Sequence, residues 1–324
     1  PLLGETFEFV TDDFEYLAEQ VTHHPPVTAC YCRGRKSNYV YQTNQKTNIN
    51  FSGKCLLMSQ QFRAYIDLPD FGERYEVEFP IMSLHNFIIG TPYIDIGETM
   101  KIHKRDSNQK AIINFIRRGW FGKDKDICKL EGEICTELEG KKKRTETLLQ
   151  ITGNWNAEIY LQRVKPSKGD VEMVWRKAPY PEQADMMYGM SHFSLQMNYF
   201  PSWLHNKVAP TDTRRRPDQR ALENGDMKAA GDHKDFLENK QRAVRKYMEE
   251  NNLTHRAAFF EPWENPADGQ VYYMYNQKYF EHNRPNKDWT ASPDLFTQNC
   301  APEVRPYLER LLGAKKEQQD KVKK

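Results

Sequence analysis

Cysteine is scarce in this sequence, and it never occurs at a spacing that binds metal or forms a redox pair. Six cysteines are spread over 324 residues, which is neither the density nor the spacing of a disulfide scaffold. Cys30 and Cys32 are separated by one residue, so no CxxC pair of the kind that ligates zinc is present. We therefore expect reduced, structural thiols, no metal and no cofactor.

Long hydrophobic runs are also missing. No stretch approaches the ~20 apolar residues that a membrane-spanning helix needs, and no basic and then apolar leader opens the sequence. These absences predict a chain that is neither secreted nor embedded in a membrane, and we expect to find it in the cytosol.

A charge excess of either sign is absent as well. The sequence has 47 Lys and Arg against 45 Asp and Glu, which leaves a net charge of +2. A protein that attracts nucleic acid through its bulk charge is therefore excluded, and we expect no nucleic-acid partner. Any basic binding site has to be local.

Alternation of apolar and polar residues dominates between residues 2 and 197. Strand-like runs occur at residues 39–41, 48–51, 61–68 and 75–79, with turn residues between them. Because a many-stranded antiparallel sheet avoids exposed edges by closing on itself, we predict a mainly β (α+β) protein. Its first domain, residues 1–205, is expected to be a large closed antiparallel β barrel, wide enough to enclose a ligand.

The pattern changes after Pro201, where two helices are predicted. The first starts with Asp226 or Asp232 as its N-cap and ends near residues 251–252. At ~100° per residue its buried stripe comprises Phe236, Leu237, Lys240, Val244, Tyr247 and Met248. The second helix covers residues 303 to about 321. We assign residues 206–324 to a helical and mixed subdomain that packs on the barrel.

The most distinctive motif is Glu-Gln-Val-Thr-His-His-Pro-Pro at residues 19–26. Pro25 and Pro26 have a fixed φ and push the residues before them into extended geometry. Two adjacent imidazoles are therefore held on a stiff loop. An isolated histidine pair in such a turn is usually structural, but the whole octapeptide favours a binding element rich in hydrogen-bond donors.

This octapeptide resembles the signature of the oxysterol-binding-protein-related family, with Thr22 at the position where the family usually has Ser. Other segments match family patterns in the same order, at residues 1–6, 84–90, 114–122, 153–155, 210–220 and 275–280. The resemblance extends over about residues 1–296.

The resemblance implies a lipid-transfer domain whose barrel holds one lipid and whose mouth binds the headgroup of phosphatidylinositol 4-phosphate. A phosphomonoester demands several charge-assisted donors, and His23 and His24 can supply them. Lys234, Glu238 and Arg242 match the family's Lys, Glu and Arg at intervals of four on the helix at the tunnel entrance. Lys234 and Arg242 would neutralise phosphates, and Glu238 would accept hydrogen bonds from inositol hydroxyls.

The resemblance further implies exchange with a second lipid, a sterol or phosphatidylserine, between membranes, with no bond made or broken, so no enzyme is expected. We expect peripheral association with the anionic surfaces of organelle membranes. The basic clusters at residues 141–144 and 214–216 are candidate contacts, although solvated turns are their commoner role. Two alternatives stay open. One is a phosphoinositide-sensing tether that never encloses a lipid. The weaker one is a metal-dependent hydrolase, disfavoured because the HExxH spacing is absent.

In the family, a Lys and an Asn just before the segment matched by residues 1–5 contribute to the headgroup site, and a lid further upstream covers the tunnel. Neither is part of this sequence. We therefore expect this chain to bind phosphatidylinositol 4-phosphate weakly, to adhere to membranes through exposed apolar lining, and to transfer lipid poorly compared with an extended chain.

Overall fold

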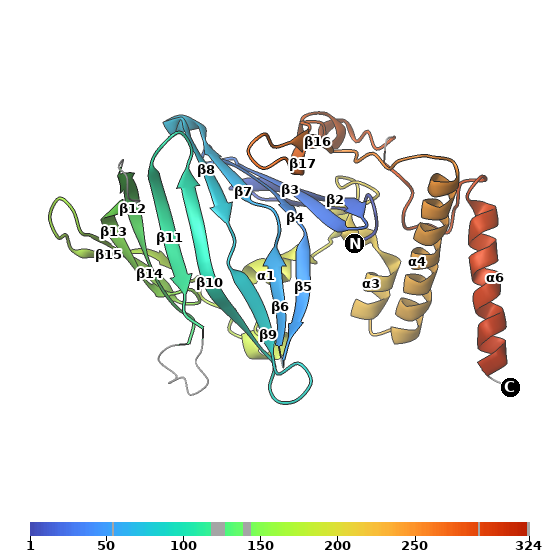
Figure 1. Cartoon of the computed structure of the whole chain (residues 1–324). Coiled ribbons are helices and arrows are strands. Elements are labelled where there is room, and N and C mark those ends of the chain that lie inside the picture. Colours follow the sequence, from blue (N-terminus) through green and yellow to red (C-terminus); the bar gives the residue numbers. More distant parts are fainter. Residues whose placement is uncertain (54, 118–126, 139–143, 291, 323–324) are drawn as a thin grey trace. The chain divides into compact units, whose positions relative to one another are not determined.

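The computed structural model describes residues 1–53, 55–117, 127–138, 144–290 and 292–322, without the side chains of residues 314–322 (Figure 1). Contacts group the chain into two compact units. Unit 1 comprises residues 1–11, 15–31 and 194–324, and unit 2 comprises residues 12–14 and 32–193. The N-terminal strands thus group with the C-terminal part of the chain, across the predicted boundary at residue 205.

Unit 2 contains an antiparallel sheet of short strands, as the alternation predicts. The strands are β4 (Val40–Gln45), β5 (Thr47–Ser52), β6 (Cys55–Gln60), β7 (Ala64–Leu68), β8 (Glu73–Glu78), β9 (Ile81–His85), β10 (Tyr93–Lys104), β11 (Gln109–Phe115), β12 (Lys129–Leu138), β13 (Arg144–Asn154), β14 (Glu158–Arg163) and β15 (Val171–Arg176). Their order is β4, β7, β8, β10, β11, β12, β13, β14, β15, and β9, β6 and β5 branch from β10 (Figure 1). The branch exists because residues 101–104 of the long β10 pair with β8 while residues 93–97 pair with β9.

The predicted closure of this sheet into a barrel is wrong for the residues that the structure describes. Among the described strands, no ladder joins β15 to any strand of the path other than β14. All six residues of β15 and all six of β5 are exposed, as edge strands are. Alternation predicts which face of a strand is buried, but closure depends on strand tilt and stagger, which no local pattern encodes.

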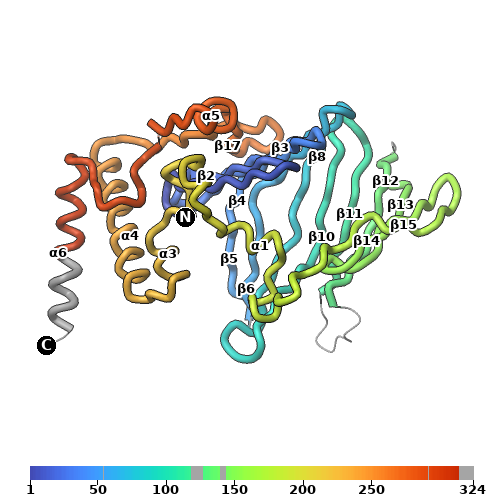
Figure 2. The backbone as a smooth tube through the Cα atoms, turned by 180° about the vertical axis from the view of Figure 1, so that it is seen from behind, coloured from blue at the N-terminus to red at the C-terminus, as the bar shows by residue number. Residues whose placement is uncertain are grey.

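Unit 1 combines three N-terminal strands with the C-terminal helices. Its strands β1 (Thr6–Val10), β2 (Phe14–His23) and β3 (Pro26–Gly34) are neighbours in that order, and β16 (Phe260–Glu264) pairs with β17 (Val271–Tyr275). Its helices are α1 (His192–Met197), α2 (Ser202–His205), α3 (Pro217–Glu223), α4 (Met227–Glu250), α5 (Arg284–Asn286) and α6 (Arg305–Val322). Figures 1 and 2 both show α3 and α6 alongside α4.

Helix α4 confirms the helix prediction closely. The carboxylate of Asp226 accepts a hydrogen bond from the Ala229 N–H, which caps the N-terminus, and the helix ends before Asn251. The predicted stripe faces inward, with Leu237 and the stem of Lys240 fully buried. Next to that stripe, Ala243 forms a small core with Leu308 of α6, the second predicted helix, and with Val304 just before it. Burial of this apolar face, and not helix propensity alone, stabilises both helices.

A buried ion-pair network connects β1 with residues far along the chain in unit 1. The side chains of Arg214 and Asp212 lie 2.8 Å apart and are 3% and 0% exposed. The Glu8 carboxylate accepts hydrogen bonds from the Tyr279 hydroxyl (2.9 Å) and from Arg284 Nε (2.8 Å). Each of these charges is paired with an opposite one, which is the condition for keeping charges away from water.

The arginine cluster at residues 214–216 is therefore held by partners within unit 1 and is not a solvated turn. Besides the buried Arg214, Arg216 pairs with Glu5 (2.9 Å) and Asp218 (2.6 Å). Arg215 donates to three backbone carbonyl oxygens, those of His205, Val208 and Ala209. The sequence shows the three cations and the nearby carboxylates of Asp212 and Asp218, but not that the fold buries these pairs and adds the distant Glu5.

The structure also describes the thiols, a phenylalanine pair and the helices. All six cysteines are free thiols. Phe260 at the start of β16 and Phe259 just before it are buried, so this pair packs in the core. In the other basic cluster, residues 141–143 lie outside the described residues. None of the described helices is long and apolar enough to cross a bilayer.

Candidate functional site

The histidine motif forms the end of β2 and the start of β3, and its polar side chains brace the turn between them. Thr22 Oγ1 donates to the Pro25 carbonyl oxygen (2.6 Å), and Gln20 Nε2 donates to the Thr22 carbonyl oxygen (2.7 Å). The Thr28 hydroxyl donates to Gln20 Oε1 (2.7 Å). These bonds tie β2 to β3 on both sides of the turn, so the motif is held by side chains as well as by its prolines.

Glu19, the first residue of the motif, is a buried anchor and not part of the exposed turn. Its two carboxylate oxygens accept hydrogen bonds from the backbone N–H groups of Ala258 (2.7 Å) and Phe259 (2.9 Å). Burial raises the pKa of Glu19 to about 7, although both hydrogen bonds oppose the rise. The residue therefore fixes β2 against the segment that precedes β16.

The two imidazoles of the motif have different surroundings. The ring centroids of His23 and His24 lie 4.6 Å apart with the planes at 67°. His24 is exposed, and its Nε2 lies 2.6 Å from Arg245 Nη1. His23 is half-buried, and its Nδ1 has no hydrogen-bond partner among the described residues. Burial, and after it the charges of His24 and Arg245, lowers the pKa of His23.

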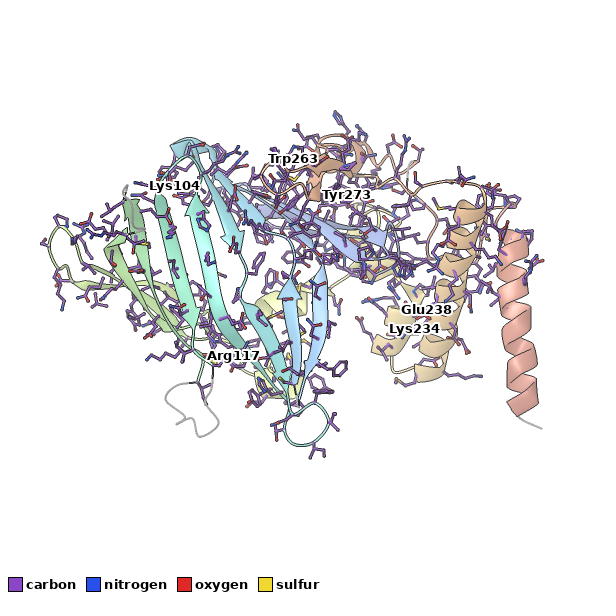
Figure 3. The ribbon with its side chains drawn as sticks, in the orientation of Figure 1. Lys104, Arg117, Lys234, Glu238, Trp263 and Tyr273 are labelled. Carbon is purple, nitrogen blue, oxygen red and sulfur yellow. The ribbon has the colours of Figure 1, made fainter. Side chains whose placement is uncertain are left out.

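The three predicted residues of α4 lie one turn apart along the helix, and Figure 3 shows Lys234 and Glu238 in sequence along it. Glu238 Oε2 lies 3.2 Å from Arg242 Nη2, an i,i+4 ion pair in which both side chains stay about half exposed. Arg242 also donates to the Asn239 side-chain oxygen (3.2 Å). Because water reaches this pair, it contributes little to stability, and its side chains remain available to a ligand.

All five residues predicted for the headgroup site line one cavity of about 470 Å³ in unit 1, which we call the headgroup cavity. Its wall comprises Pro1, Leu2, His23, His24, Arg216, Lys234, Glu238, Gln241, Arg242 and Arg245. Arg216 is already paired with two carboxylates. The rest of the wall presents three cationic side chains, Lys234, Arg242 and Arg245, against the single carboxylate of Glu238.

Arg245 also lines this wall and was not predicted for the site from the sequence. Arg245 connects α4 with the histidine motif, because it belongs to α4 and contacts His24. It also pairs with Glu249 (3.4 Å). At 100° per residue Arg245 falls about 20° from Lys234, on the side of Glu238. The helical periodicity therefore contained a signal for it, which a search restricted to intervals of four overlooks.

Comparison with known proteins identifies the family. The family model described as "Oxysterol-binding protein" matches residues 1–284. The chain belongs to the oxysterol-binding-protein family. It is 30% identical over 300 residues to human oxysterol-binding protein-related protein 6, covering 91% of this chain and 30% of the relative. It is 31% identical over 263 residues to mouse oxysterol-binding protein-related protein 3, covering 80% and 29%. The chain thus spans less than a third of the length of these relatives.

Solved structures of the family share the fold. The Osh1 ORD domain in complex with cholesterol superposes with a TM-score of 0.76 at 25% identity, over 93% of this chain and 71% of that one. The Osh3 ORD in complex with PI(4)P, from Saccharomyces cerevisiae, superposes with a TM-score of 0.74 at 24% identity, over 91% and 74%. The mainly β architecture with a large antiparallel sheet is therefore that of the family.

Proposed function

We propose that the protein binds the headgroup of phosphatidylinositol 4-phosphate in the headgroup cavity and exchanges this lipid for a second one between membranes, without catalysing a reaction. The observation that carries the proposal is the meeting, in one cavity, of residues from two segments more than two hundred positions apart. His23 and His24 come from the motif, and Lys234, Glu238 and Arg242 come from α4.

The chemistry of the cavity suits a phosphorylated inositol. A phosphomonoester carries about −1.5 to −2 charges near neutral pH, and the wall offers the cations Lys234, Arg242 and Arg245. Charge-assisted hydrogen bonds from such groups are roughly twice as strong as neutral ones. Glu238 would accept hydrogen bonds from the inositol hydroxyls. A site with only cations would not distinguish a phosphorylated inositol from another phosphate.

The second lipid is proposed to be a sterol or phosphatidylserine that competes for the same interior. Support comes from the family, because the Osh1 domain has been solved with cholesterol and with ergosterol. The chain would then work in the cytosol, peripherally bound to the anionic surfaces of organelle membranes.

The test is removal of phosphatidylinositol 4-phosphate from liposomes by the purified protein, followed by lipid analysis of the soluble fraction. Changing His23 and His24 together to Ala would delete two hydrogen bonds to the phosphate, each worth about 1.5 to 3 kcal/mol because the acceptor is charged, so headgroup binding should weaken at least about a hundredfold. His192→Ala, on the exposed start of α1, is the matched control and should extract normally. Unchanged extraction by a folded double variant would refute the assignment.

A phosphoinositide-sensing tether is the second candidate, and the open sheet of the described residues favours it. Such a protein would use the same headgroup cavity but would not enclose the lipid. In the liposome experiment it would sediment with vesicles containing phosphatidylinositol 4-phosphate and leave no lipid in the supernatant. A transfer protein would carry lipid into the supernatant.

A further inference from the structure

Arg245 and His24, which both line the headgroup cavity in unit 1, meet through two nitrogen atoms. Nη1 of Arg245 lies 2.6 Å from Nε2 of His24. A guanidinium has only N–H donors, offers no acceptor and stays protonated in proteins. Arg245 can therefore only donate in this contact, so Nε2 of His24 is the acceptor and carries no proton.

This contact leaves one protonation state for the ring of His24. An imidazolium carries a proton on both nitrogens, and the neutral tautomer with its proton on Nε2 would also set two N–H groups against each other. Only the neutral tautomer with its proton on Nδ1 accepts a hydrogen bond at Nε2. In that state Nδ1–H is the single donor of the His24 side chain.

The guanidinium of Arg245 is oriented from a second side as well. Its Nε lies 3.4 Å from Oε1 of Glu249, one turn further along α4, which leaves Nη1 for His24. Because the guanidinium is planar and rigid, the two contacts together fix the direction in which it donates. The bond from Arg245 is also the only hydrogen bond that the exposed side chain of His24 makes with the described residues. Nδ1–H of His24 therefore has no partner among them.

The position of this proton matters for a phosphate ligand. A phosphate oxygen accepts hydrogen bonds, so a neutral imidazole binds it only through the protonated nitrogen. The bond that one ring nitrogen makes determines where the proton of the ring lies. Without a donor at Nε2, the proton of His24 is divided between two nitrogens, and only part of the molecules present Nδ1–H. The apparent affinity of a site falls by the fraction of molecules in the competent state.

We propose that Arg245 is a positioning residue, which keeps the proton of His24 on Nδ1 so that His24 offers this N–H to the phosphate in the headgroup cavity. Arg245 then acts chiefly through His24, and its charge makes a smaller contribution. The assignment of the tautomer stands by itself, whereas the positioning role rests on the proposed function.

The tautomer is tested first, on the purified chain with no ligand present. NMR of nitrogen-labelled imidazoles at about pH 8, where histidines of ordinary pKa are neutral, distinguishes a protonated ring nitrogen from an unprotonated one. The variant His24→Gln identifies the signals of His24 by their loss. We expect Nδ1 of His24 to be protonated and Nε2 to be unprotonated. A protonated Nε2 would overturn the proposal.

Variants of α4 then show whether Arg245 sets this tautomer. Arg245→Met removes the donor, so the signals of both ring nitrogens should move toward averaged positions. Arg245→Lys, whose ammonium group also only donates, should restore the pattern of the unsubstituted protein. Lys246→Met is the matched control, because Lys246 pairs with Glu250 and takes no part in the cavity wall, and it should leave the signals of His24 unchanged. An unchanged His24 tautomer in Arg245→Met would also overturn the proposal.

The positioning role is tested by calorimetry with inositol 1,4-bisphosphate, the soluble headgroup, in a double-mutant cycle. Arg245→Met should weaken binding about three- to tenfold when His24 is present, but at most about twofold in a His24→Ala background, because the two residues act together. Arg245→Lys should recover most of the lost affinity. Equal losses in both backgrounds would show that Arg245 acts on the phosphate directly, which refutes the positioning role.

The NMR and binding experiments can fail separately. If His24 has the expected tautomer but inositol 1,4-bisphosphate does not bind to the unsubstituted chain, the tautomer assignment stands, and the proposed function fails together with the positioning role. If inositol 1,4-bisphosphate binds but Nε2 of His24 is protonated, the proposed function stands and the inference about Arg245 fails.

Discussion

Two groups of cationic side chains in unit 1 look alike in the sequence and differ in the structure. Arg214, Arg215 and Arg216 form the densest arginine cluster of the chain, yet each is committed to carboxylates or carbonyl oxygens within the protein. Lys234, Arg242 and Arg245 are dispersed along α4, stay exposed, and line the headgroup cavity with one carboxylate. The comparison teaches that availability for a ligand depends on internal partners and not on local charge density.

The largest expected effect is the loss of stability when the buried Arg214–Asp212 pair is broken. Arg214→Ala leaves Asp212 buried without its partner, and removing one side of a buried ion pair costs about 3 to 5 kcal/mol. Urea unfolding should show this loss. Arg242→Ala removes a half-exposed pair and should change the free energy of unfolding by about 0.5 kcal/mol or less. Equal losses in the two variants would show that the α4 pair is structural as well.

Glu19 extends the comparison to a buried carboxylate that has no cationic partner among the described residues. Burial raises the pKa of Glu19 from its ordinary value of 4.5 to about 7. The folded state therefore holds a proton that the unfolded state releases, so the stabilisation is complete below pH 4.5 and is lost as pH rises to about 7. It amounts to about 3 kcal/mol. Glu19→Gln should lack this component of the pH dependence. If the free energy of unfolding changed equally with pH in both proteins between pH 4.5 and 7.5, this prediction would be contradicted.

The exposed cations Lys234 and Arg242 of α4 should matter more for ligand affinity than for the stability of the fold. Lys234→Ala or Arg242→Ala each removes a cation from the headgroup cavity, which should weaken binding of phosphatidylinositol 4-phosphate about tenfold or more, because hydrogen bonds to charged groups are worth about 1.5 to 3 kcal/mol. Binding of a fluorescent sterol, which carries no phosphate, should be spared. If the affinities for both lipids and the melting temperature fell together, these two cations would be structural.

The smallest effect separates two adjacent cations of α4. Arg245 contacts His24 and lines the headgroup cavity, whereas Lys246 is paired only at 3.9 Å with Glu250 and takes no part in that wall. Arg245→Ala should weaken headgroup binding about three- to tenfold, in proportion to a partly shared charge, and Lys246→Ala should leave it unchanged. Liposome extraction with both variants measures the difference, and identical behaviour of the two would exclude Arg245 from the site.

The sequence by itself determined the features that depend on a few neighbouring residues. Asp226 and Asp232 were the two candidate N-caps of α4, because a side-chain oxygen can cap a free N–H three residues on, and Asp226 is the one that does so. The face of α4 around Leu237 is recognisable because helical periodicity places its apolar residues together. The resemblance to the family singled out His23 and His24 of the motif and Lys234, Glu238 and Arg242 of α4, and these residues line one cavity.

Only the tertiary structure decided which distant groups meet. Whether β15 finds a second partner besides β14 depends on the tilt and stagger of the whole sheet, so alternation predicted strands correctly and barrel closure wrongly. Arg216 pairs with Glu5 and Arg214 donates to the Glu8 carbonyl oxygen, both more than two hundred residues away, and Arg245 meets His24 over a similar separation. Contacts between residues so far apart in the sequence follow from packing, and no local sequence pattern encodes them.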